Sequence, residues 1–165
     1  MSGSPRLALP FLSAGQAQKE ATHNEALQTL DLLVGAAVEQ EPNSDPPAAP
    51  VPGACYLVAE APTGAWAGKS QTVAGYTSGG WRFLAPVEGL VAYVKSTAQF
   101  ACYREGSWET GVLRGSSLVL AGQQVVGTRA AAIASPTGGS TVDNEARGAI
   151  ADVLAALRQH GLIDV

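Results

Sequence analysis

The chain has 165 residues, 15 % of which are charged, and its formal net charge at pH 7 is −4. An acidic chain lacks the basic surface on which nucleic-acid binding depends, so we expect no nucleic-acid partner. No segment approaches the roughly 18 consecutive apolar residues of a membrane-spanning helix, and residues 1–10 lack the apolar run of a secretory signal, so we expect cytoplasmic synthesis without membrane insertion.

The N-terminal part, residues 1–41, is predicted to be a short arm followed by a helix from about residue 14 to 40. Strong helix formers begin after Ser13, which is a plausible N-cap. His23 lies four residues before Leu27, on the same helix face, and we interpret it as a half-buried packing residue rather than a ligand. The apolar positions that recur at helical spacing are Leu27, Leu30, Val34 and Val38.

Residues 42–52 contain five prolines and therefore cannot be a helix or a central strand. We expect an extended linker there. Residues 53–128 are predicted to be an antiparallel β domain, a small barrel or sandwich of hairpins, because short apolar segments alternate with turn residues. The strands are expected at 54–59, 71–76, 81–84, 90–94, 99–103 and 108–112, with a further hairpin around Gly122.

The aromatic residues follow a repeated pattern. Trp66, Trp81 and Trp108 each follow a glycine by two residues, and the last two extend to Tyr-x-x-Gly-x-Trp with Tyr76 and Tyr103. Glycine supplies the positive φ of a tight hairpin turn, so each Tyr should pair with its Trp across the ladder. These five residues are candidates for carbohydrate binding by stacking, but we favour a core role for at least two of the tryptophans. Trp66 is predicted to be the most exposed, because its loop is richest in Gly and Pro.

Residues 129–140 are predicted to be a linker of small residues, and residues 141–163 a C-terminal helix. Thr141 can cap this helix, while Gly161 suits the left-handed position after its end, with Leu162 reaching back to Leu157. A seam of heptad type runs along it, so the helix either packs on its own β domain or closes against other copies, in a trimer. The candidate oligomerisation residues are Ala146, Ile150, Val153 and Leu157. The fold class is therefore predicted to be α+β.

No catalytic constellation can be assembled from the sequence. Phosphate-binding loops, zinc-protease motifs and nucleophile elbows are absent, and the chain has only two histidines. Cys55 and Cys102 have no metal-ligand spacing, and we expect free buried thiols rather than a disulfide. We therefore predict no enzyme activity, no metal and no cofactor.

Two segments carry a specific resemblance. They are the run from Leu9 through Gln16-Ala17-Gln18-Lys19-Glu20 to Leu27, and Pro62-Thr63-Gly64-Ala65-Trp66-Ala67-Gly68 with Gly80-Trp81-Arg82-Phe83 behind it. Together they resemble a family catalogued as a domain of unknown function, from tailed phages and gene transfer agents of alphaproteobacteria, over roughly residues 7–110. The C-terminal helix looks like those on many phage fibre and tail proteins, which commonly form trimers.

The resemblance implies a structural or adhesive protein, a head spike or tail fibre, located in a virion or gene-transfer-agent particle. Its partners would be capsid, tail or spike proteins and host surface polysaccharide, bound directly or through a partner spike. A stand-alone carbohydrate-binding module and, less favoured, a polysaccharide-degrading enzyme are the alternatives. Contact with the particle is expected at Leu9, Phe11, Gln16, Gln18, His23 and Asn24. The low charge favours a homo-oligomer over a weakly charged monomer, and the C-terminal helix favours a trimer.

Overall fold

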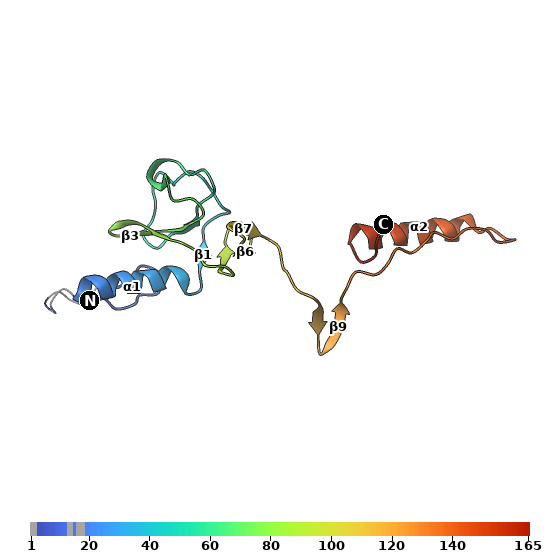
Figure 1. Ribbon diagram of the computed structural model, residues 1–165, viewed down its shortest axis with the longest axis horizontal. Coiled ribbons are helices and arrows are strands. Elements are labelled where there is room, and N and C mark those ends of the chain that lie inside the picture. Colours follow the sequence, from blue (N-terminus) through green and yellow to red (C-terminus); the bar gives the residue numbers. More distant parts are fainter. Residues whose placement is uncertain (1–2, 13–14, 16–18) are drawn as a thin grey trace. The chain divides into compact units, whose positions relative to one another are not determined.

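A computed structural model describes residues 3–12, 15 and 19–165 of the chain. It divides into two compact units, Met1–Leu113 and Arg114–Val165, which we describe separately (Figure 1). Within the described residues there are two α-helices and three sheets, none of them closed into a barrel, so the predicted α+β class is confirmed. Neither helix is long and apolar enough to cross a membrane.

The N-terminal helix, α1, spans Lys19–Leu33. It ends well before the predicted limit near residue 40 because Gly35 takes a left-handed conformation, with φ of 56°, that turns the chain out of the helix. The two residues that follow the turn form β1 (Ala37–Val38), which pairs in parallel with β5. The predicted cap, Ser13, lies outside the described residues.

The larger sheet has the order β1-β5-β6-β7. Its antiparallel part consists of β5 (Val91–Val94), β6 (Gln99–Arg104) and β7 (Ser107–Thr110). Tyr103 lies opposite Trp108 with ring centroids 5.2 Å apart, as the repeated pattern predicted.

The second sheet has the order β2-β3-β4 and is antiparallel throughout. It consists of β2 (Cys55–Leu57), β3 (Val73–Thr77) and β4 (Gly80–Leu84). Tyr76 faces Trp81 across the ladder with centroids 5.0 Å apart. Both predicted aromatic hairpins are therefore confirmed.

The main core lies where α1 meets the strands. A β-carbon added to Gly75 on β3 would lie 2.1 Å from Leu32 Cδ2, so only glycine allows the fully buried Leu32 side chain to approach the strand this closely. The buried members of this cluster are Leu32, Ala36, Val38, Cys55, Leu57, Val73, Ala92, Val94 and Ala101.

The proline-rich segment, residues 42–52, is hydrogen-bonded to the second sheet rather than extending away as a linker. Asn43 forms a parallel bridge with Val58; its amide donates to the Leu57 carbonyl (3.0 Å), and its carbonyl accepts from Ala59 N (2.9 Å). Because proline has no N–H, these bonds are made by the residues between the prolines. The segment thereby becomes a fixed wall of the N-terminal unit.

The C-terminal unit contains the hairpin β8 (Leu118–Leu120) and β9 (Gln123–Val126), and the helix α2 (Asn144–Gln159). Asp143, not Thr141, caps α2, because its carboxylate accepts from Ala146 N at 2.9 Å. The predicted helix end is confirmed: Gly161 has φ of 66°, and Leu162 N donates to the Leu157 carbonyl at 2.9 Å.

The segment before α2 returns along the helix. Ala130 forms a parallel bridge with Ile163, and the Arg158 guanidinium donates to the Ile133 carbonyl at 2.7 Å. Residues 114–165 are all described, and among them only Leu154 and Ile163 are buried hydrophobic residues. The unit is therefore held mainly by backbone and arginine hydrogen bonds around a very small core.

Candidate functional site

The aromatic residues form part of a second core cluster. Trp66 is fully buried, and its indole lies 5.3 Å from Trp81 and 5.6 Å from Tyr56, measured between ring centroids. The prediction that Trp66 is the most exposed tryptophan is wrong. Its Gly- and Pro-rich loop forms a 3-10 turn, Gly64–Trp66, that places the indole among the neighbouring rings. A ring covered in this way has no free face for stacking on a sugar.

The other predicted stacking residues are half-buried. Trp81 packs against the same cluster as Trp66, whereas Trp108 packs against the main core and donates from Nε1 to the Gln71 carbonyl at 3.0 Å. Tyr76 and Tyr103 each cover one side of their partner tryptophan. The hairpin aromatics therefore support the core, and carbohydrate binding by them stays a prediction.

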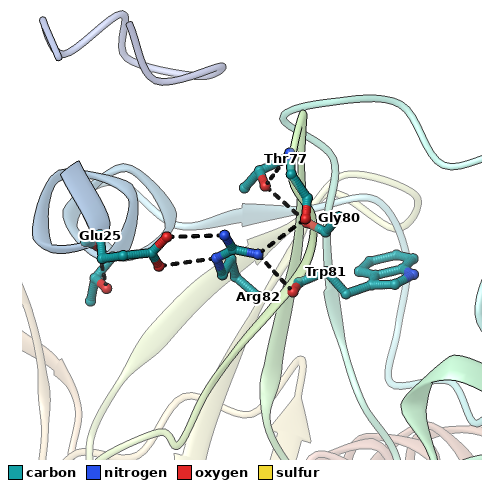
Figure 2. A network of polar contacts seen from close by, with 7 residues as sticks. Glu25, Thr77, Gly80, Trp81 and Arg82 are labelled. Carbon is teal, nitrogen blue, oxygen red and sulfur yellow. Dashed lines mark hydrogen bonds and ion pairs between the residues drawn. The ribbon is translucent and has the colours of Figure 1, made fainter. Parts of the chain in front are cut away.

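An ion pair between Glu25 on α1 and Arg82 on β4 joins the helix to the β3–β4 hairpin (Figure 2). The Glu25 carboxylate accepts from Nε and Nη2 of Arg82, both at 3.0 Å, in a bidentate arrangement. Arg82 Nη1 also donates to the Gly79 and Trp81 carbonyls. The hydrogen bonds from Arg82 lower the pKa of Glu25, so the carboxylate stays charged near neutral pH.

The N-terminal arm folds around a buried carboxylate on the last turn of α1. Asp31 accepts from Ser4 Oγ (2.7 Å), from Arg6 N (3.0 Å) and from Leu7 N (2.5 Å). The Arg6 guanidinium donates to the carbonyls of Asp31 and Leu32 in the last turn of α1 and to that of Gly35 just beyond it. The last carbonyls of a helix have no partner within the helix, so these bonds stabilise its end. Four polar groups of the arm thus converge on one helix end.

The predicted particle-contact residues lie on and beside this arm. Leu9 and Phe11 are partly exposed, and His23 is exposed rather than half-buried. The Asn24 amide holds the arm against α1, because it accepts from Leu12 N (2.9 Å) and donates to the Leu12 carbonyl (3.2 Å). Gln16 and Gln18 lie outside the described residues.

The arm, the residues that follow β1 and the proline-rich segment line an open cavity of about 720 Å³. Its wall carries Arg6 and Lys95 against Glu39 and Asp45, and Lys95 Nζ pairs with Glu39 at 2.6 Å, so the charges balance. Sequence reasoning missed this site because the cavity depends on residues 42–52 being folded back, and a run of prolines does not indicate a wall.

Tyr56 is an aromatic residue of the cavity lining. It is only 8 % exposed, but its hydroxyl is not among the buried polar atoms that lack a partner in the described part of the chain. Burial raises the pKa of the Tyr56 phenol, so the group stays a neutral donor at physiological pH. A neutral phenol at the wall of a cavity can donate a hydrogen bond to a bound polar molecule.

The two cysteines of the chain are not joined in a disulfide. Cys55 and Cys102 are both free, as the sequence predicted, but only Cys55 is buried, whereas Cys102 is half-buried. Burial raises the pKa of the Cys55 thiol to about 11. Such a thiol is a poor nucleophile at neutral pH. Among residues 3–12, 15 and 19–165 no group of three His, Cys, Asp or Glu side chains could hold a metal ion.

The predicted oligomerisation seam lies on the solvent side of α2. Ala146, Ile150 and Val153 are exposed, and Leu157 is half-buried. The neighbouring face of the helix carries the buried Leu154. The helix thus packs through one stripe and leaves a second apolar stripe uncovered.

Comparison with known protein families finds a match. Residues 23–109, more than half of the chain, match a family described as "Protein of unknown function (DUF2793)". The matched region runs from α1 to β7 and includes the tryptophans and the cavity wall of residues 42–52. No curated protein matches the sequence.

Proposed function

The chain belongs to the DUF2793 family, and we propose that it is a structural and adhesive component of a phage-like particle, a head spike or tail fibre. Support for the particle comes from the resemblance of its Leu9–Leu27 and Pro62–Gly68 segments to proteins of tailed phages and gene transfer agents. In this proposal the particle is linked to host surface polysaccharide, either by the chain itself or by a partner spike protein.

The two units have different tasks in this proposal. The N-terminal unit forms the body, and its arm contacts the particle through the partly exposed Leu9 and Phe11. The arm is suited to this task because Asp31 fixes its backbone in advance, which reduces the entropy lost on binding. The C-terminal unit holds copies of the chain together, in a homo-oligomer for which we favour a trimer.

The observation that carries the proposal is the uncovered apolar seam of α2. Ile150 and Val153 are exposed on a helix that is capped at both ends, so a second surface is needed to cover them. Heptad spacing is the pattern with which helices pack on other helices. A self-assembling unit joined in one chain to a separately folded unit is the organisation expected of a spike or fibre.

Light scattering on the full chain tests the assembly. Ile150→Lys should lower the mass in solution, because it places a charge in the seam, whereas the matched control Ala155→Lys, at an exposed position on the opposite side of α2, should not. Purified particles from cells that encode the chain should contain the wild-type protein. Absence of the protein from such particles would contradict the proposed location.

A carbohydrate-binding module is the second candidate, and the cavity beside Tyr56 favours it. The cavity volume of about 720 Å³ lies in the usual range of ligand sites, roughly 300–1,000 Å³. Balanced charges, amides such as that of Gln40 and the Tyr56 hydroxyl suit a neutral polyhydroxylated ligand. In a glycan array, Tyr56→Phe and Gln40→Ala should weaken the binding signal of the wild type. Equal binding by the variants would show that the glycan does not bind in this cavity.

A further inference from the structure

The β8–β9 hairpin has no charged residue. Residues 115–128, which include both strands and the turn, contain neither Asp, Glu, Lys nor Arg. Edge strands of soluble proteins usually carry charges or prolines that prevent pairing with other chains, and this hairpin has neither. A bare two-stranded hairpin is also marginally stable in water.

Apolar side chains project from both faces of this hairpin. Leu120 lies opposite Gln123, and Val119 opposite Gln124. Residues opposite each other share a face and successive residues alternate, so Leu120 and Val119 lie on opposite faces. An irregularity of the register between Leu118 and Val119 interrupts this alternation at the start of β8. Val119 and Leu120 are 53 % and 57 % exposed. The hairpin therefore needs cover on two sides.

The remainder of the C-terminal unit supplies little cover. Residues 114–165 are all described, and they bury only Leu154 and Ile163, whereas the large hydrophobic residues left exposed are Leu118, Val119, Leu120, Val125, Val126, Ile133, Val142, Ile150, Val153, Leu162 and Val165. A unit of this size rarely folds on so small a core without a metal, disulfides or association with other chains. Both cysteines of the chain lie outside this unit.

We propose that the β8–β9 hairpin is held between the hairpins of two further copies of this chain, in a closed ring of three or more. The proposal rests on the self-association proposed above but assigns it to a surface other than α2. A copy of the chain is the favoured occupant because the unit needs its partner in order to fold. The unit also offers no net charge to a partner of opposite sign, since its four arginines are balanced by four Asp and Glu residues.

The two-sided cover determines the symmetry. In a two-fold dimer each chain uses the same patch, which leaves one hairpin face open. When the Leu120 face of one copy contacts the Val119 face of the next, both faces are covered and the assembly is cyclic. If the rotation between successive copies did not close a ring, the same two faces would instead build a filament.

Cysteine cross-linking of the full chain tests which faces meet. Gln123→Cys and Gln124→Cys place a thiol on opposite faces at exposed positions, in a background in which Cys102 is replaced by serine. Under mild oxidation a mixture of the two variants should give covalent dimers between unlike chains, while each variant alone should stay unlinked. Like-with-like cross-linking would overturn the cyclic arrangement.

Charge substitutions supply a second measurement on the same surface. Val119→Lys and Leu120→Lys should each lower the solution mass, whereas the control Val165→Lys, at the exposed chain end, should leave it unchanged. Tryptophan fluorescence reports separately on the fold of the N-terminal unit, because all three tryptophans lie there. A monomeric wild type would overturn both this inference and the proposed self-association. The same holds if the chain is monomeric because the hairpin packs on its own N-terminal unit. If Ile150→Lys lowers the mass but the hairpin variants do not, only the hairpin inference fails.

Discussion

The two units of this chain place their apolar residues in opposite ways. In the N-terminal unit they fill two core clusters, and Leu32 closes against Gly75 more tightly than any other residue at that position would allow. In the C-terminal unit only Leu154 and Ile163 are buried, and the hairpin and the α2 seam stay exposed. This difference is the one expected if the N-terminal unit folds from its own residues and the C-terminal unit depends on contacts between copies, as we propose.

The largest expected effect is on the aromatic cluster of the N-terminal unit. Trp66→Ala should lower the free energy of unfolding by about 3–5 kcal/mol, because it opens a cavity among Tyr56, Trp81 and the buried Val58. Urea denaturation followed by circular dichroism measures this. Leu113→Ala is the control, since its side chain is 90 % exposed and should contribute little. A near-zero effect of Trp66→Ala would mean that the indole is not a core residue.

A smaller loss is expected where α1 meets β3. Gly75→Ala should destabilise the N-terminal unit by about 1–3 kcal/mol, because the new methyl group would overlap the Leu32 side chain. Thermal unfolding of this variant should begin at a lower temperature than that of the wild type. An unchanged midpoint would show that Leu32 can move aside, and that the helix contact is looser than we infer.

In the C-terminal unit a glycine-to-alanine substitution should raise the stability instead of lowering it. Gly148 lies inside α2 with nothing within 4 Å of the place that a β-carbon would occupy. Gly148→Ala should therefore stabilise the helix by up to about 1 kcal/mol, because alanine loses less backbone entropy than glycine. Ellipticity at 222 nm should rise. A fall would indicate that copies approach each other closely at Gly148.

The smallest expected effect concerns the Glu25–Arg82 pair in the N-terminal unit. The pKa of Glu25 is lower in the folded state than in the unfolded chain, where it is about 4.3. The pair's contribution to the free energy of unfolding is therefore complete above the unfolded-state pKa and is lost as the pH falls through the lower folded-state pKa. Because the Glu25 side chain is largely exposed, we expect at most about 1 kcal/mol at pH 7. The stability difference between wild type and Glu25→Gln should therefore shrink towards zero as the pH falls below about 4.3 and Glu25 becomes protonated. A difference that persists there would point to packing rather than charge.

The sequence predicted those features that depend on residues close together along the chain. Both Tyr-x-x-Gly-x-Trp hairpins were found because the turn glycine and the flanking aromatics lie within six residues of each other. The end of α2 was found for the same reason, from Gly161 and Leu162. The cap of α2 was predicted at Thr141 and lies at Asp143, because threonine and aspartate are both good capping residues.

Features set by distant contacts were missed. Val38 continues the helical spacing of Leu27, Leu30 and Val34, yet it forms a strand because Gly35 turns the chain toward β5. Trp66 was expected outside because a Gly- and Pro-rich loop usually lies on the surface, and only the cluster with Tyr56 and Trp81 explains its burial. No local pattern relates Asp31 to an arm more than twenty residues earlier, or residues 42–52 to a cavity.

Hydrogen exchange at several protein concentrations tests the contrast between the units most directly. In the full chain, amides of β3 and β6 should be protected equally at low and high concentration, because their hydrogen bonds and core are internal to one copy. Amides of β8, β9 and α2 should gain protection as the concentration rises and copies associate. Equal, concentration-independent protection of both units in a monomeric chain would contradict the account.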